Sequence, residues 1–185
     1  PVDLLYLGGI GTYVRASSEP DADLDDRANT ELRVTADQLR ARVVGEGANL
    51  GFTQRARIEY ARRGGRINMD AIDNAAGVAT SDREVNIKIL LDLAVADGSL
   101  AAADRPALLA RVTDDVVADV LHDCAGQSDA IGRAAERSAS NLDAFWATQD
   151  DLVAAGDLDA ALEHLPDDDE YAAREDAGAG LTRPE

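Results

Sequence analysis

Short apolar runs that end in glycine alternate with polar, helix-compatible segments in the first part of the chain. Residues 2–7 and 41–45 are apolar, have the length of strands and lead into glycine turns, so the pattern predicts two buried strands. Residues 66–68 give a weaker third strand, and residues 53–63 are compatible with a helix that Thr53 caps. Because strands alternate with a helix, we expect a parallel sheet in an α/β domain.

Beyond this region the apolar residues repeat at helical rather than strand spacing. Residues 69–80 are rich in Asp, Asn and Gly, which predicts a loop. Ser81 and Glu84 have the spacing of a capping box and precede a dense apolar segment. The pattern therefore predicts a buried helix over residues 81–96.

The remaining residues predict only helices. Asp104 can cap the first of them, and its apolar stripe consists of Leu108, Leu109, Val112, Val116, Val117, Val120 and Leu121. Residues 127–155 predict one long helix or two, residues 158–165 a short helix, and Pro166 the start of another. The expected fold class is α/β, with a partial parallel sheet followed by an all-helical region.

The charge of the chain argues against one class of function, nucleic-acid binding. It has 36 acidic and 18 basic residues and a net charge of −18, which disfavours binding to nucleic acid phosphates.

No run approaches the roughly 18 apolar residues of a membrane span. With Cys124 as the only cysteine beside two histidines, we expect neither a disulfide nor a metal site, and a reducing, cytoplasmic location. Because the sequence opens on Pro1 directly before an apolar run, we also expect it to be a piece of a longer protein.

Two predicted strands end in glycine-rich turns, Gly8-Gly9-Ile10-Gly11 and Gly45-Glu46-Gly47-Ala48-Asn49. Ligands of open parallel sheets bind beyond the carboxyl ends of the strands, where glycine lets a flat cofactor approach the backbone. The first turn is not a full dinucleotide fingerprint, since Val14 stands where the third glycine belongs. From spacing alone, a nucleotide site and a pair of simple turns both remain open.

Longer motifs add a resemblance to a family. The segment Val43–Asn49 resembles the strand and turn of glutamate dehydrogenases, and Asp70–Ser81 resembles their Asp-x-x-x-Asn-Ala-Gly-Gly-Val-x-x-Ser stretch. Gly8–Val14 and Ser81–Leu90 look like the large bacterial NAD-specific branch. The resemblance covers nearly the whole chain and is most specific over residues 43–90.

The resemblance implies a fold and an activity. Residues 1–92 would be the C-terminal half of a Rossmann-like, NAD-binding catalytic domain, and residues 93–185 an incomplete helical C-terminal region. The parent protein, expected to be a homo-oligomer, would convert L-glutamate with NAD to 2-oxoglutarate and ammonia. The catalytic lysine, the proton-shuttling aspartate and the phosphate-binding turn would all lie before Pro1. Because Lys88, the one lysine present, falls within a predicted helix, we assign no catalytic residue to this chain and expect it to be inactive alone.

The resemblance also implies which residues contact the cofactor. Asn49 and Asn74 would lie near the nicotinamide end of NAD, and the alternative for both is a turn-closing role. Gly47 and Gly77 would keep the backbone clear of cofactor and substrate, and the alternative is again tight turns. These four residues are the expected cofactor-binding residues.

Val78 and Ser81 would lie on the substrate side, with the serine hydroxyl donating to the side-chain carboxylate of glutamate. The alternative for Ser81 is the capping box, although one hydroxyl can both donate and accept. The sequence departs from the family pattern at Ala76, where a glycine is expected, and at Asp73, where compact enzymes have a small apolar residue. Asp70 and Asp73 have the composition of an acid/base pair, but solvated loop carboxylates are the preferred interpretation.

Three other functions stay open. A relative that acts on branched or aromatic amino acids is one, although Ser81 argues against it because those enzymes have an apolar residue there. A non-catalytic helical module that binds a partner through the stripe from Leu108 to Leu121 is the second. A plain acidic helical protein with a chance motif is the third.

Overall fold

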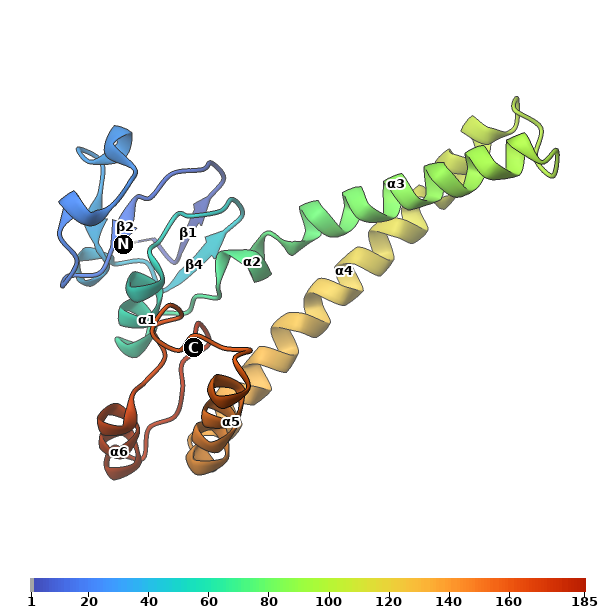
Figure 1. Ribbon diagram of the computed structural model, residues 1–185. Helices are drawn as coiled ribbons and strands as arrows, with labels where there is room; N and C mark the ends of the chain where they lie inside the picture. The colour runs from blue at the N-terminus through green and yellow to red at the C-terminus, as the bar shows by residue number, and fades with distance from the viewer. Residues whose placement is uncertain (1) are drawn as a thin grey trace. The chain divides into compact units, whose positions relative to one another are not determined.

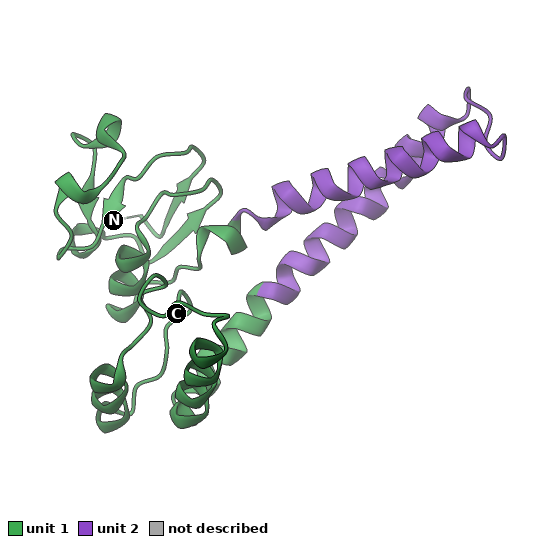
Figure 2. Ribbon diagram, in the orientation of Figure 1, with its two compact units in different colours: residues 1–73, 128–185 green, residues 74–127 purple. Residues whose placement is uncertain are grey.

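A computed structural model describes residues 2–185, which form two compact units (Figure 2). The first unit contains the chain up to Asp73 together with residues 128–185. The second contains residues 74–127. The molecule is mixed α/β and mostly helical, with small parallel sheets.

The central strands of the first unit are β1 (Leu4–Leu7) and β4 (Val43–Glu46), which pair in parallel from Leu4 opposite Val43 to Leu7 opposite Glu46 (Figure 1). Both predicted strands and their parallel pairing are therefore confirmed, but the predicted burial is wrong for β1, where Leu4 and Tyr6 are 56% and 65% exposed. The weak third strand is reduced to one bridge between Arg66 and Val43. Its pairing ends there because the chain turns into a new helix four residues later.

A second parallel pair, which the sequence pattern did not indicate, consists of β2 (Val14–Arg15) and β3 (Val34–Thr35). The segment between these two strands is acidic. It contains two short 3₁₀ helices, η1 (Asp21–Asp23) and η2 (Arg27–Asn29), and a third one, η3 (Ala36–Gln38), follows β3.

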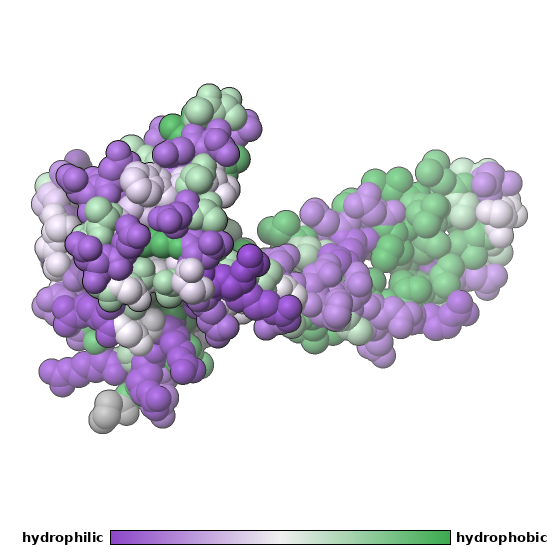
Figure 3. Space-filling view, turned by 90° about the horizontal axis from the view of Figure 1, so that it is seen from below, coloured by the Kyte–Doolittle hydropathy of each residue, from purple (hydrophilic) through white to green (hydrophobic). Residues whose placement is uncertain are grey.

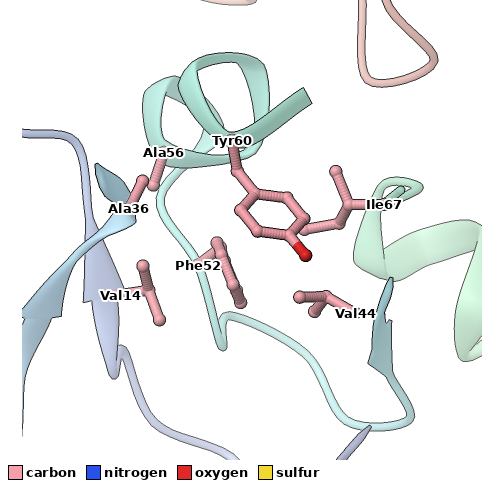
Figure 4. Packing of buried hydrophobic residues seen from close by; sticks show 7 residues of the cluster. All are labelled: Val14, Ala36, Val44, Phe52, Ala56, Tyr60 and Ile67. Atoms are coloured by element: carbon pink, nitrogen blue, oxygen red, sulfur yellow. The ribbon is translucent and has the colours of Figure 1, made fainter. Parts of the chain in front are cut away.

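Helix α1 (Gln54–Arg62) covers the hydrophobic core of the first unit. Thr53 caps it as predicted, since its hydroxyl accepts the Ala56 N–H at 3.1 Å. Phe52 and Tyr60 meet edge to face at 6.1 Å, and the Tyr60 hydroxyl donates to the Ala41 carbonyl at 2.7 Å. Figure 4 shows the core side chains, which are Val14, Ala36, Val44, Phe52, Ala56, Tyr60 and Ile67.

The predicted loop over residues 69–80 is wrong. The segment forms α2 (Asp70–Asp73) and the beginning of α3 (Ala75–Ala96). Ser81 therefore lies inside α3 and is not its N-cap; its hydroxyl donates to the Val78 carbonyl at 2.8 Å. The alanines around Gly77 favour the helix strongly enough to start it before the capping-box pattern.

The second unit is a helical hairpin made of α3 and the first part of α4 (Arg105–Ser138). Arg83 binds Asp119 at 2.7 Å and also contacts Asp123, which joins the two helices. Helix α4 begins directly after Asp104 as predicted and continues without a break to Ser138.

The predicted helix over residues 81–96 is present, but the prediction that it is buried is wrong. Leu91 is the only buried residue of α3, whereas Val78, Val85, Ile89, Leu90 and Leu93 are each at least half exposed. Hydrophobic surface is correspondingly visible on the hairpin (Figure 3). Burial requires a covering surface, and within the described residues α4 covers only one side of α3.

The first unit also contains α5 (Leu142–Ala155) and α6 (Asp168–Ala177), and Asp167 caps α6 through the Glu170 N–H at 2.9 Å. The predicted short helix over residues 158–165 is wrong, because this segment forms only turns. His164 has a left-handed φ of 55°, which ends any helical continuation there.

We expect Thr53→Ala to lower the free energy of unfolding by about 1 kcal/mol, because α1 loses its N-cap acceptor. Urea unfolding followed by Trp146 fluorescence measures the change within the same unit. Thr113→Ala is the matched control, since that exposed hydroxyl only contacts the Leu109 carbonyl of its own helix. An equal loss in both variants would contradict the capping role.

Candidate functional site

The candidate site begins at the β4–α1 turn, which we define as residues 47–52. Because β1 and β4 are parallel and adjacent, their carboxyl ends lie at the same edge of the sheet. Gly8 follows β1 directly and Gly47 follows β4. The turn therefore places Gly47 and Asn49 where ligands of open parallel sheets bind.

Three carboxylates hold the backbone of this turn. Glu46 accepts the Phe52 N–H at 3.0 Å, and Asp70 accepts the Leu50 N–H at 2.8 Å. Asp73 accepts the N–H of Glu46 itself at 2.9 Å. Hydrogen bonds to charged acceptors are stronger than neutral ones, so the turn has a fixed conformation despite its glycines.

Arg57 joins two of these carboxylates. Its Nε and Nη2 donate to the Glu46 side chain at 2.6 and 3.0 Å, and Nη2 lies 3.0 Å from Asp70 Oδ2. Glu46 is fully buried and Arg57 is 5% exposed. Burial raises the pKa of the Glu46 carboxyl, while the Arg57 hydrogen bonds act in the opposite direction.

A second polar chain begins at Asp73. Asn68 donates to Asp73 Oδ1 at 2.7 Å, and its own carbonyl oxygen accepts from Arg183 Nε at 2.7 Å. Arg183 Nη2 in turn donates to the backbone and side-chain oxygens of Ser128, both at 3.0 Å. Asp70 and Asp73 are thus structural acceptors, and their interpretation as solvated loop carboxylates is wrong.

Gly47 lies against the side chain of Tyr6. A Cβ atom built on it would lie 1.8 Å from the Tyr6 hydroxyl oxygen. Because Tyr6 is 65% exposed, its ring can turn outward to relieve the contact. The packing therefore does not by itself require glycine at this position, and its expected role beside a cofactor stays a prediction.

Four further predicted site residues belong to the second unit. Asn74 directly precedes α3, and Gly77, Val78 and Ser81 lie in its first two turns, where all three are exposed. A Cβ atom added to Gly77 would meet Asn74 Oδ1 at 3.5 Å, an ordinary contact. The packing of this unit does not require glycine there. That all these residues line one cleft with Gly47 and Asn49 stays a prediction.

The sequence did not indicate the roles of Glu46, Arg57 and Asp73. Two signals were available in the sequence. Glu46 is a charged residue at the end of an apolar strand, and Arg57 stands between Ala56 and Ile58, which are both buried. Charged residues at such positions are usually paired.

The described part of the chain contains no group of three or more His, Cys, Asp or Glu side chains arranged for a metal ion. Within residues 2–185 no helix has the length and apolar character needed to cross a membrane.

Comparison with known proteins defines the family. A family model described as "Bacterial NAD-glutamate dehydrogenase, catalytic domain" matches residues 1–134. Proteins named NAD-specific glutamate dehydrogenase are 51% identical in Mycobacterium tuberculosis and 52% in Pseudomonas aeruginosa, over 185 residues each. A protein of the same name from Halomonas elongata is 48% identical over 184 residues.

The chain belongs to the bacterial NAD-glutamate dehydrogenase family, an enzyme family, which confirms the resemblance seen in the sequence. Each of the three matches covers 100% of this chain and 11% of the relative. The chain therefore spans about a tenth of the length of the curated relatives it matches.

We expect Arg57→Met to lower the free energy of unfolding by about 3–5 kcal/mol, because Glu46 would be left as a buried charge without its partner. Urea unfolding measures the loss. Arg55→Met, on the exposed side of the same helix, should change stability by less than about 0.5 kcal/mol. Similar effects of the two substitutions would show that the buried ion pair does not hold the unit together.

Proposed function

We propose that this chain forms part of the NAD site of a glutamate dehydrogenase. In this proposal β1 and β4 belong to a Rossmann-like sheet, residues 1–92 to the NAD-binding domain, and residues 93–185 to a helical C-terminal region. The observation that carries it is the β4–α1 turn, a glycine turn held by the buried Glu46 and the partly buried Asp70 at the carboxyl edge of parallel strands. The names of the relatives support NAD as the cofactor.

The residues present fit a flat cofactor at two places. The β4–α1 turn presents Gly47 and Asn49 at a strand end, and Gly77 is an exposed glycine in a helix with room for a side chain. Such a glycine costs a helix about 1 kcal/mol relative to alanine, and a requirement for open space beside a cofactor would account for it. We assign Gly47, Asn49, Asn74 and Gly77 to the nicotinamide end. NAD, when bound, would accept hydride as L-glutamate is converted to 2-oxoglutarate and ammonia.

Val78 and Ser81 are the proposed substrate-side residues. They lie one helical turn apart at the start of α3, and the first turn of that helix contains no acidic residue. A helix N-terminus favours an anionic group, which suits a carboxylate of glutamate. To donate to that carboxylate, the Ser81 hydroxyl has to leave the Val78 carbonyl that it contacts.

No catalytic residue is assigned to this chain. Lys88, its one lysine, lies on α3 and pairs with Glu84 one turn earlier, with 46% of its side chain exposed. An ammonium group in that setting is neither desolvated nor placed at a strand end, so nothing adapts it to acid–base catalysis. The catalytic lysine and aspartate of the proposed reaction must come from elsewhere in a longer, homo-oligomeric enzyme.

A second candidate function is a contact role for the hairpin of the second unit. The exposed Val85, Ile89 and Leu93 recur on one side of α3, and isolated surface helices seldom present such a stripe to water. This observation favours a longer protein in which another part of the molecule covers this side of α3. It is compatible with the dehydrogenase proposal.

We expect Gly77→Ala, introduced into the full-length dehydrogenase, to raise the KM for NAD on the order of tenfold, because the methyl group would occupy space that the cofactor needs. In the 185-residue chain the same change should raise stability by up to about 1 kcal/mol. Steady-state kinetics and urea unfolding measure the two effects.

The matched control for this substitution is Gly126→Ala, another helix glycine with nothing within 4 Å of an added Cβ. It should give the gain in stability without the change in KM. An unchanged KM for NAD in Gly77→Ala would place Gly77 away from the cofactor, and a rise confined to glutamate would move it to the substrate side.

We expect the 185-residue chain alone not to oxidise glutamate. Its lysine is engaged with Glu84 on a helix, and no other amine side chain is available as a base. The test follows absorbance of the reduced cofactor with glutamate and NAD, beside the full-length enzyme as the positive control. Turnover near that of ordinary enzymes, roughly 1–1000 per second, would show that the catalytic group lies within this chain.

A further inference from the structure

We propose that Asp73 is a positioning residue whose carboxylate fixes the β4–α1 turn and thereby sets the affinity for NAD. This inference rests on the proposed function, in which that turn contacts the cofactor. Nothing in the resemblance to glutamate dehydrogenases assigns a role to this side chain. The argument starts from the incomplete edge of the small sheet.

On the side of β4 that faces away from β1, the hydrogen bonds of a second parallel ladder begin but do not continue to the end of the strand. The Val44 N–H donates to the Arg66 carbonyl at 2.8 Å, and the Arg66 N–H donates to Arg42 at 3.0 Å. In a continued parallel ladder the Glu46 N–H would donate to the carbonyl of residue 68. The chain leaves the sheet before that point, and the Glu46 N–H donates to Asp73 Oδ2 at 2.9 Å. The side chain of Asp73 therefore replaces the backbone acceptor of a third strand.

The second oxygen of Asp73 is also engaged, which fixes the rotamer of the side chain. Asn68 donates its amide to Asp73 Oδ1 at 2.7 Å. The orientation of that amide is set from the other side, since Arg183 Nε, which can only donate, contacts Asn68 Oδ1 at 2.7 Å. A carboxylate whose two oxygens both accept hydrogen bonds is held as an anchor and is poorly suited to transfer protons.

The anchor acts on Glu46, the residue directly before the turn. Glu46 both donates its N–H to Asp73 and accepts the Phe52 N–H through its side chain, so its backbone and its carboxylate close the two ends of the turn. Gly47 follows Glu46 directly and has no side chain to restrict it. Loss of the Asp73 contact would therefore loosen the start of the turn at Gly47 while the Glu46–Arg57 pair stays in place.

Asp73→Asn is the isosteric test, made in the full-length dehydrogenase. The NH2 group introduced at position 73 must face either the Asn68 amide or the Glu46 N–H. Both of these groups are donors, so one of the two hydrogen bonds is lost. We expect hydrogen exchange in the peptide 43–52 to become on the order of tenfold faster. The KM for NAD should rise on the order of tenfold, while kcat changes less than about twofold because no reacting group is touched.

A swap of the two side chains provides the rescue. In Asn68→Asp/Asp73→Asn the net charge is unchanged: the new amide at position 73 can donate to the new carboxylate at position 68 and accept from Glu46. The carboxylate at 68 still accepts from Arg183. Exchange and KM should both return to within about threefold of the unaltered enzyme. Asp157→Asn, the same chemical change at an exposed residue, should alter neither quantity.

The outcomes separate this inference from the proposed function when Asn49→Ala is measured in parallel. If Asn49→Ala raises the KM for NAD but Asp73→Asn changes neither exchange nor KM, the positioning role is overturned and the cofactor site stands. If faster exchange in Asp73→Asn leaves KM unchanged although Asn49→Ala raises it, the inference also fails. If neither variant changes KM, the cofactor assignment itself is wrong.

Two further results bear on the mechanism. A KM that stays raised in the swap variant would show that charge at position 73, rather than its hydrogen bonds, matters, which overturns the inference. Should Asp73→Asn fail to fold, Asn68→Ala removes the group that orients Asp73 and, with it, the acceptor of Arg183 Nε. It is expected to raise the KM for NAD severalfold, and an unchanged value would count against the proposal.

Discussion

The buried ion pair between Glu46 and Arg57 is the constraint on which the first unit depends. A fully buried carboxylate is costly to desolvate, and it is tolerated here because the guanidinium binds both of its oxygens. The same carboxylate accepts the Phe52 N–H, which leads the chain into the core beneath α1. One interaction therefore connects the end of β4, the following turn and α1, and each would lose a polar partner without it.

A sheet of two four-residue strands is marginal by itself. The Glu46 N–H, which a larger sheet would satisfy, is satisfied here by Asp73, and Asp70 accepts the Leu50 N–H of the following turn. Side-chain acceptors can hold an irregular turn in a way that a strand cannot, because they need not repeat with the period of the ladder. The arrangement thus combines rigidity with a glycine-rich backbone, which is the combination that a preorganised binding turn requires.

The sequence predicted the elements whose cause is local. The apolar runs ended by glycine gave β1 and β4, and Thr53 marked the start of α1. It failed at Ser81 because a capping-box pattern is indistinguishable from the same residues inside a helix that started earlier. It also failed on the burial of residues 81–96, since burial depends on a neighbouring surface that no local pattern contains. Asn49, Asn74 and the glycines came from the resemblance, whereas the role of Asp73 required the geometry of the unfinished ladder.

The two predicted cofactor glycines differ in what the structure says about them. Gly47 has the Tyr6 hydroxyl where a Cβ would stand, although that exposed ring can turn away. Gly77 has no such neighbour, does not have a left-handed φ and lies in a helix that alanine would stabilise. Departures from local preference tend to occur at functional sites, where the loss of stability is accepted for another reason. Gly126 of α4 shares these properties, so a helix glycine alone does not mark a ligand site; what distinguishes Gly77 is the motif that surrounds it.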